Sequence, residues 1–242
     1  MSTATRHHVH VVPDFTVLIV AKAPVPGFAK TRLCPPLQPE GAAEVAAAAL
    51  LDTLRLAAGA TSGDRSRVVV SVTGELSASA RHDALLDALA GCHVVEQRGA
   101  TFSERLRQAH GDASTLGSGA PVVQIGMDTP HADPAHLVDA ARAVGSSHRS
   151  AVIGDATDGG WWLLALADPA AALTLLDVPM SRPDTGALTR SALTAAGLTV
   201  GDVAPIMDVD TWDDATAVAA EHPETLFAKA VLHQRHTAGI TA

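Results

Sequence analysis

Phe15-Thr-Val-Leu-Ile-Val-Ala-Lys22 is a continuous apolar run that ends on a lysine. A run of this kind, rich in β-branched residues, is typical of a strand that is buried on both faces of a parallel sheet. The Ala/Leu-rich segment from Pro39 to Ala58 is long enough to form a helix, and Arg67 to Val72 again indicates a strand. Together these segments predict a β-α-β unit.

The same alternation continues along the chain. Further helices are expected near residues 77–90, 102–113, 134–144 and 183–196, and further strands at 93–95, 121–125, 150–153, 161–165 and 198–203. Strands that alternate with helices predict an α/β fold, here a single-domain, mostly parallel, doubly wound sheet with helices on both faces. We expect the domain to span residues 15–235, between a flexible N-terminal tail (1–14) and a C-terminal tail (236–242).

Composition excludes several classes of protein. The 242 residues are 47% apolar and 18% charged, which is typical of a globular chain and not of a disordered one. Lys and Arg number 17 against 26 Asp and Glu, and the net charge of −9 has the wrong sign for wrapping a nucleic-acid backbone. No apolar run reaches the ~18 residues that span a bilayer, and the two cysteines lack metal or disulfide spacing. We expect a cytoplasmic protein that binds neither nucleic acid nor membrane.

The loop after the first strand gathers basic residues. Doubly wound sheets bind ligands beyond the carboxyl ends of their strands, so the loops there are candidate sites. The segment Ala21 to Leu33 contains Lys22, Lys30 and Arg32, which can bind phosphate oxygens as point charges or as a bidentate fork. The alternative is a solvated basic loop. The glycine spacing of a P-loop is absent.

Two later loops carry carboxylates. Asp128 lies in Gly-Met-Asp-Thr-Pro directly after the strand at 121–125, where it could ligate Mg²⁺ or instead cap the next turn. In Met-Asp-Val-Asp-Thr, Asp208 and Asp210 would face the same way if the backbone is extended, and they could share one cation. Asp213 and Asp214 are explained by the first turn of a helix that begins at Thr211.

A third segment reads Asp158-Gly159-Gly160-Trp161-Trp162. Asp-Gly-Gly is a strong signal for a hairpin turn, which is the alternative to a functional role for Asp158, and the glycines would also let the backbone approach a ligand closely. If the tryptophans belong to a strand, their rings point to opposite faces, so that one is core and the other can line a pocket. We expect Asp158, Gly159, Gly160, Trp161 and Trp162 to supply the acceptor pocket.

These four segments, in this order, resemble a bacterial family of transferases called DUF2064, or rSAM/selenodomain-associated transferase 1. The resemblance covers residues 17–219 and implies the Rossmann-like GT-A fold of the nucleotide-diphospho-sugar transferases, which also includes the 2-phospho-lactate and molybdenum-cofactor guanylyltransferases. It implies a nucleotide over the first strands and Mg²⁺ or Mn²⁺ on acidic residues.

Site residues follow from the resemblance. The nucleotide phosphates would contact the first loop and a later arginine, namely Ala21, Lys22, Gly27, Lys30, Arg32 and Arg98. The metal would be held by Asp128 with Asp208 or Asp210, and Lys30 and Asp128 would be catalytic. The segment Gln97 to Arg105 matches the family less well, with Thr101 and Phe102 where the family tends to carry Gly and Leu, and it offers Arg98 and Arg105 as weaker candidates.

Three functions are consistent with these residues. In nucleotidyl transfer, the phosphate or carboxylate of a small acceptor attacks the α-phosphorus of a nucleoside triphosphate, and pyrophosphate leaves. The cations of the first loop favour this reaction, because a triphosphate carries more charge than a sugar diphosphate. Glycosyl transfer from a nucleotide-diphospho-sugar is the alternative, and a non-catalytic nucleotide-binding protein is the third.

Overall fold

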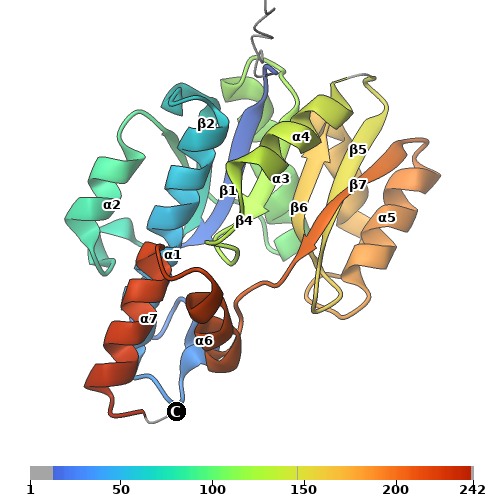
Figure 1. Cartoon of the computed structure of the whole chain (residues 1–242). Coiled ribbons are helices and arrows are strands. Elements are labelled where there is room, and N and C mark those ends of the chain that lie inside the picture. The colour runs from blue at the N-terminus through green and yellow to red at the C-terminus, as the bar shows by residue number, and fades with distance from the viewer. Residues whose placement is uncertain (1–12, 146, 241–242) are drawn as a thin grey trace, which may run out of the picture.

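A seven-stranded sheet in the order β3-β2-β1-β4-β6-β5-β7 forms the centre of the protein (Figure 1). The computed structural model describes residues 13–145 and 147–240. The strands are β1 Thr16–Lys22, β2 Val68–Thr73, β3 His93–Glu96, β4 Val122–Gly126, β5 Ser150–Ala156, β6 Trp161–Leu166 and β7 Thr199–Ile206. The α-helices are α1 Pro39–Ala60, α2 His82–Leu89, α3 Phe102–Leu116, α4 Pro134–Val144, α5 Thr185–Ala195, α6 Trp212–Glu221 and α7 Leu226–Thr237. Short 3₁₀ helices are η1 Thr31–Leu33, η2 Arg65–Arg67, η3 Leu76–Ala78 and η4 Pro169–Asp177.

Neighbouring strands run parallel except at β6, which is antiparallel to both β4 and β5. The mostly parallel α/β fold predicted from the sequence is therefore confirmed. Because β6 is reversed, the turn that precedes it lies at the same edge as the carboxyl ends of β1, β4, β5 and β7. All four candidate loops consequently belong to one edge of the sheet, called the carboxyl edge below.

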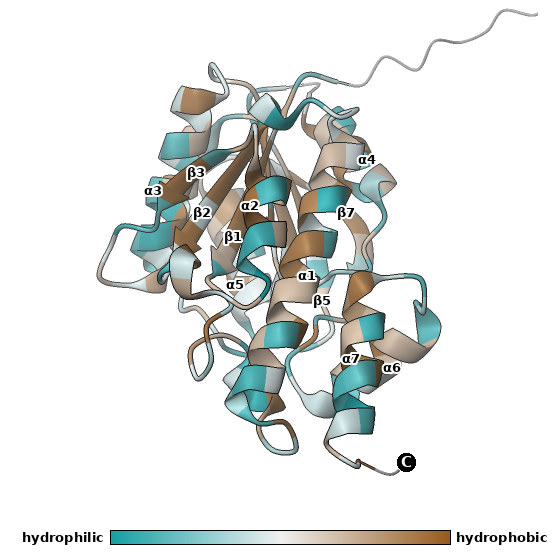
Figure 2. Ribbon diagram, turned by 90° about the vertical axis from the view of Figure 1, so that its left-hand side faces the viewer, coloured by the Kyte–Doolittle hydropathy of each residue, from teal (hydrophilic) through white to brown (hydrophobic). Residues whose placement is uncertain are grey.

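Helices cover both faces of the sheet. Apolar side chains of α1, α2 and α4 pack with the strands in one cluster, and those of α3, η4 and α5 pack on the opposite face. A further cluster joins α6 and α7 to α1 and to the loop after β1, and Figure 1 shows these two helices beyond the carboxyl edge. Figure 2 shows the central strands in the hydrophobic colour, whereas the surrounding helices alternate between both colours.

Several helix ends agree with the sequence signals. Asp133 caps α4 by accepting from the amide of Ala135, and a proline occupies the first turn, as predicted. The helix expected over 77–90 is shorter, because Arg81 has a left-handed backbone (φ 53°) and α2 starts only after it. Helices η4 and α7 have no counterpart among the elements predicted from the sequence. Residues 1–12 of the predicted N-terminal tail lie outside the described residues. The C-terminal tail predicted from residue 236 begins within a helix, because α7 continues to Thr237.

No helix among residues 13–145 and 147–240 combines the length and the hydropathy that crossing a bilayer requires.

Candidate functional site

Three carboxylates meet at the carboxyl edge. Asp158 from the turn between β5 and β6 lies with Asp208 and Asp210 from the segment after β7, and one carboxylate oxygen from each lies within 4.8 Å of the others. Asp158 is exposed, and the other two are half-buried. Oxygen ligands clustered in this way suit a hard divalent cation such as Mg²⁺. We call Asp158, Asp208 and Asp210 the acidic trio.

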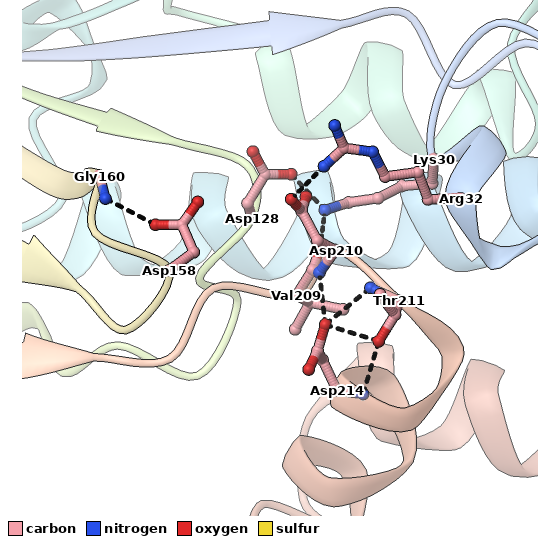
Figure 3. A network of polar contacts seen from close by, with 9 residues as sticks. All are labelled: Lys30, Arg32, Asp128, Asp158, Gly160, Val209, Asp210, Thr211 and Asp214. Carbon is pink, nitrogen blue, oxygen red and sulfur yellow. Dashed lines mark hydrogen bonds and ion pairs between the residues drawn. The ribbon is translucent and has the colours of Figure 1, made fainter. Parts of the chain in front are cut away.

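The turn that presents Asp158 is fixed from two sides. A carboxylate oxygen of Asp158 accepts from the amide of Gly160 at 2.7 Å, which closes the turn on itself (Figure 3). Gly159 has φ +90°, and a Cβ there would lie 1.9 Å from the carbonyl oxygen of Pro183, so only glycine fits. The carbonyl of Gly159 also accepts from the amide of Gly186 in α5 at 2.9 Å. The turn is therefore docked on the first residues of α5.

The pKa of Asp208 is raised by its surroundings. Burial, followed by the nearby negative charges of Asp158, Asp210 and Asp128, raises the pKa of the Asp208 carboxyl to about 6, against a smaller opposing backbone hydrogen bond. Burial and like charges both disfavour an ionised carboxylate. A bound cation would offset this penalty.

Lys30 fastens three segments of the edge together. Its ammonium group contacts the carboxylate of Asp128 and the carbonyl oxygen of Val209 (Figure 3). The Lys30 side chain is only 7% exposed, whereas that of Asp128 is 46% exposed. The amide of Val209 in turn donates to the carbonyl of Asp128 at 2.8 Å. The loop after β1, the loop after β4 and the segment after β7 are thus held to one another.

Arg32 and the first turn of α6 complete the contacts of the last segment. The guanidinium of Arg32 lies 2.6 Å from the Asp210 carboxylate, and the Arg32 side chain is exposed whereas that of Asp210 is half-buried. Thr211 and Asp214 form a capping box at the start of α6, as the sequence predicts, and the Asp214 carboxylate also accepts from the amide of Asp210 at 3.2 Å. Asp210 is thereby positioned by its own backbone and by a cation.

The remaining residues predicted to bind the phosphates have different environments in the structure. Lys22, at the end of β1, is exposed, and its ammonium group lies 6.0 Å from the centre of the Phe28 ring. Ala21 is buried, and its carbonyl accepts from the Gln97 amide at 3.0 Å. Gly27 is exposed with φ +74°. Arg98 forms an ion pair with Asp112 of α3 at 2.5 Å, so it is engaged within the protein.

The two tryptophans are committed to the interior. Trp162 is 3% exposed, lies in the main core cluster, and donates from its indole nitrogen to the carbonyl of Ala204 at 3.1 Å. Trp161 packs with the cluster on the opposite face and donates to the hydroxyl of Thr189 at 3.2 Å. The predicted alternation is observed, but both indole donors already have internal partners.

Two residues that help to build the site were not identified in these roles from the sequence. Asp158 was considered for an acceptor pocket, and the structure places it in the acidic trio; Asp128 instead forms an ion pair with Lys30. Gln97 donates to the carbonyls of Ala21 and Ser71, at 3.0 and 2.9 Å, and so joins the ends of β1 and β2. The position of Gln97 directly after a strand was the available signal.

Comparison with known proteins gives a family. The chain belongs to the family DUF2064, described as uncharacterized protein conserved in bacteria, whose model matches residues 55–182. No curated protein matches the chain.

Solved structures share the fold. A putative nucleotide-diphospho-sugar transferase from Desulfovibrio desulfuricans G20 has a TM-score of 0.74 at 22% identity, over 93% of this chain and 96% of that one. A cytidylyltransferase from Leptospira borgpetersenii has 0.57 at 13%, over 94% and 96%. Rv0371c from Mycobacterium tuberculosis H37Rv has 0.52 at 20%, over 84% and 97%. These likenesses of fold agree with the α/β architecture that the sequence predicts.

Proposed function

We propose that the protein is a metal-dependent transferase that moves a nucleotidyl group from a nucleoside triphosphate to a small phosphorylated or carboxylated acceptor. The observation that carries this proposal is the acidic trio at an edge that also presents Lys22, Lys30 and Arg32. A cation site beside basic side chains is what phosphoryl chemistry needs, because both neutralise phosphate charge.

The acidic trio fits a divalent cation. Asp158, Asp208 and Asp210 would hold Mg²⁺ or Mn²⁺, and the half-buried Asp208, whose pKa is raised to about 6, gains most from a positive charge beside it. When bound, the cation would polarise the phosphate oxygens and offset the charge that develops on them. Asp128 adds to the negative potential at Asp208, so it would strengthen the site even if it is not itself a ligand.

The protein groups have separate tasks in this reaction. No protein nucleophile is required, because the acceptor itself attacks, and catalysis rests on positioning and charge. Lys30 and Asp128 hold the loops of the edge in register, Arg32 holds Asp210, and Lys22, which forms no ion pair within residues 13–145 and 147–240, would meet the phosphates. The rigid turn at Asp158 to Gly160 would border the acceptor.

Nucleotidyl transfer is favoured over glycosyl transfer by the number of basic side chains at the edge. The proteins of similar fold include one named as a cytidylyltransferase and one named as a putative nucleotide-diphospho-sugar transferase, so this fold accompanies both names. Fold alone does not choose between the reactions.

Ligand-dependent thermal stability tests the proposal. Nucleoside triphosphates and nucleotide sugars are added with Mg²⁺, with Mn²⁺ or with a chelator, and pyrophosphate release is followed with candidate acceptors. We expect a triphosphate to stabilise the protein chiefly when metal is present, by about 2.7 kcal/mol at 100 times its Kd. Preferential stabilisation by a nucleotide sugar would support glycosyl transfer, and no stabilisation by any nucleotide would overturn both.

Matched variants locate the metal. Asp208→Asn removes one carboxylate of the acidic trio, and we expect it to abolish the metal-dependent part of the stabilisation. Asp213→Asn removes an exposed carboxylate from the first turn of α6 and is the control, because Asp213 lies outside the trio. Equal responses of the two variants to metal would remove the trio from the site.

A further inference from the structure

Two basic side chains at the carboxyl edge, Lys22 and Arg105, form no ion pair with any described residue. Within residues 13–145 and 147–240, ion pairs engage Lys30, Arg32 and Arg98, but none engages Lys22 or Arg105. The guanidinium of Arg105 lies 5.5 Å from the centre of the Phe102 ring, and Lys22 has only its contact with the Phe28 ring. Both cations are therefore available to an external anion.

Lys22 belongs to the face of the sheet that α3 covers. Successive side chains of a strand alternate between faces, so Leu18, Val20 and Lys22 share one face. Leu18 and Val20 pack in the cluster that contains Ala109 of α3. Lys22 continues the same row outward, one step beyond the end of the packed core.

The neighbours of Val20, one step inward from Lys22 on the same face, are small residues. In the sheet register, Val20 of β1 lies opposite Ser71 of β2 and Gly126 of β4. A Cβ added at Gly126 would lie 3.5 Å from the Asp128 carboxylate, an ordinary contact distance, so Asp128 borders this part of the edge. Ser71 is buried, and its hydroxyl has no hydrogen-bond partner.

Arg105 approaches the same face from above. It lies four residues before Ala109, so the two share one side of α3, with Arg105 one turn nearer the carboxyl edge. Its Nε is buried and has no acceptor in the described protein. A buried donor without an acceptor carries a free-energy cost, which an incoming oxygen atom would remove. Arg105 and Ser71 thus leave two unmatched polar groups on one face.

We propose that Arg105, together with Lys22, forms a phosphate-binding subsite on the α3 side of the carboxyl edge. A guanidinium with an unused Nε–H can bind a phosphate through two parallel hydrogen bonds, and the ammonium group of Lys22 adds a point charge. The subsite lies on the face of the sheet opposite to α1, whereas Lys30 and Arg32 belong to the loop that leads into α1. The proposal rests on the proposed function only for the source of the phosphate, which is the nucleotide tail or the acceptor.

Anion binding without metal tests the subsite independently of the transferase reaction. Calorimetric titration with inorganic pyrophosphate and with orthophosphate, in the presence of a chelator, is performed on the intact chain and three variants. We expect Arg105→Met and Lys22→Met to weaken binding of the preferred anion at least tenfold. Arg107→Met is the matched control on α3, because Arg107 is exposed and forms no ion pair among the described residues, and it should leave binding within twofold.

Two further measurements keep the test decisive. Arg105→Lys retains the charge but loses the planar fork, and its binding should be intermediate, which also covers a failure of Arg105→Met to fold. Pyrophosphate that competes with a nucleoside triphosphate identifies the nucleotide tail, whereas orthophosphate that binds alongside it identifies an acceptor phosphate.

The results that would overturn the subsite differ from those that would overturn the function. If the intact protein binds neither anion without metal, or if Arg105→Met and Arg107→Met bind equally, the subsite is refuted. Metal-dependent stabilisation by a triphosphate can persist in that case, and the proposed function would then stand without Arg105.

Discussion

The basic side chains of the carboxyl edge form two groups that differ in their partners. On the side of α1, Lys30 and Arg32 are paired with Asp128 and Asp210. On the side of α3, Lys22 and Arg105 form no ion pair with any described residue. A paired cation holds two segments together, whereas an unpaired cation can accept an anion without first releasing an internal carboxylate. Lys30 and Arg32 therefore hold the site together, whereas Lys22 and Arg105 can bind a ligand.

The comparison also changes how the first loop is understood. Its three cations form one group in the sequence, yet they have three environments: Lys22 is exposed, Lys30 is almost fully enclosed, and Arg32 lies at the surface beside Asp210. The losses of unfolding free energy on removing these side chains should therefore differ widely.

The largest effect is expected from acid on the α3 side, where His110 is kept neutral. Its ring is fully buried and contacts the Gln124 side-chain oxygen at 2.8 Å, and burial lowers its pKa to about 4. In the unfolded chain His110 binds a proton near pH 6.5, whereas in the folded protein it does so only near pH 4. The contribution of the neutral His110 to the free energy of unfolding is therefore complete above pH 6.5 and is lost as the pH falls towards 4. The loss should approach roughly 3 kcal/mol, at 1.36 kcal/mol per pKa unit.

Urea unfolding between pH 7 and pH 4.5 measures this loss. The variant His110→Gln should show a flatter dependence of unfolding free energy on pH than the intact chain. His233→Gln serves as the control, since His233 is exposed. A pH dependence in His110→Gln that equals that of the control would show that this buried ring does not cause the acid sensitivity.

A smaller loss is expected on the α1 side from Asp128→Asn. The substitution takes the Asp128 charge from the enclosed ammonium of Lys30, which keeps the Val209 carbonyl and the electrostatic attraction of Asp214. Removing one partner of a buried pair costs about 3 to 5 kcal/mol, and we expect about 2 here because Asp128 is half-exposed. Unfolding free energies in metal-free buffer give the value.

Lys30→Met provides the matched comparison for that pair. It leaves Asp128 unpaired, but water can reach a carboxylate that is 46% exposed, so the loss should be smaller than for Asp128→Asn. An equal or larger loss of unfolding free energy in Lys30→Met would mean that removing the lysine side chain costs more than leaving its buried charge without Asp128.

Much of the fold follows from the sequence, for a physical reason. Buried parallel strands must be apolar throughout, and the run from Phe15 to Ala21 meets that demand, so it could be identified without long-range information. The reversal of β6 agrees with the hairpin-turn signal of Asp158-Gly159-Gly160, whereas the strand's own apolar pattern is the same in either direction. Helix α2 was overestimated since Arg81 adopts a left-handed backbone, which is uncommon outside glycine.

The site was predictable by position but not by pairing. The rule that ligands bind beyond carboxyl ends selected loops that the structure brings to one edge of the sheet, and Asp208 and Asp210 lie close together there. The replacement of Asp128 by Asp158 in the acidic trio depends on which cation each carboxylate meets, and Lys30 meets Asp128 across 98 residues of chain. Arg98 was assigned to the nucleotide, but Asp112 of α3 engages it. Such choices are made by tertiary packing, which a single sequence does not encode locally.

The smallest effect is expected from Arg32→Ala. Its side chain is 70% exposed and that of Asp210 is 36% exposed, so the 2.6 Å ion pair competes with water and salt. Exposed pairs contribute about 0 to 1 kcal/mol, and we expect a loss below about 0.5 kcal/mol at 0.1 M salt that disappears at 1 M, where the screening length is about 3 Å. The Lys30 pair is enclosed, so the loss in Asp128→Asn should persist at 1 M salt. Unfolding both variants at the two salt concentrations separates a surface contact from a structural one, and an Arg32→Ala loss that survives high salt would place Arg32 with Lys30 among the residues that build the edge.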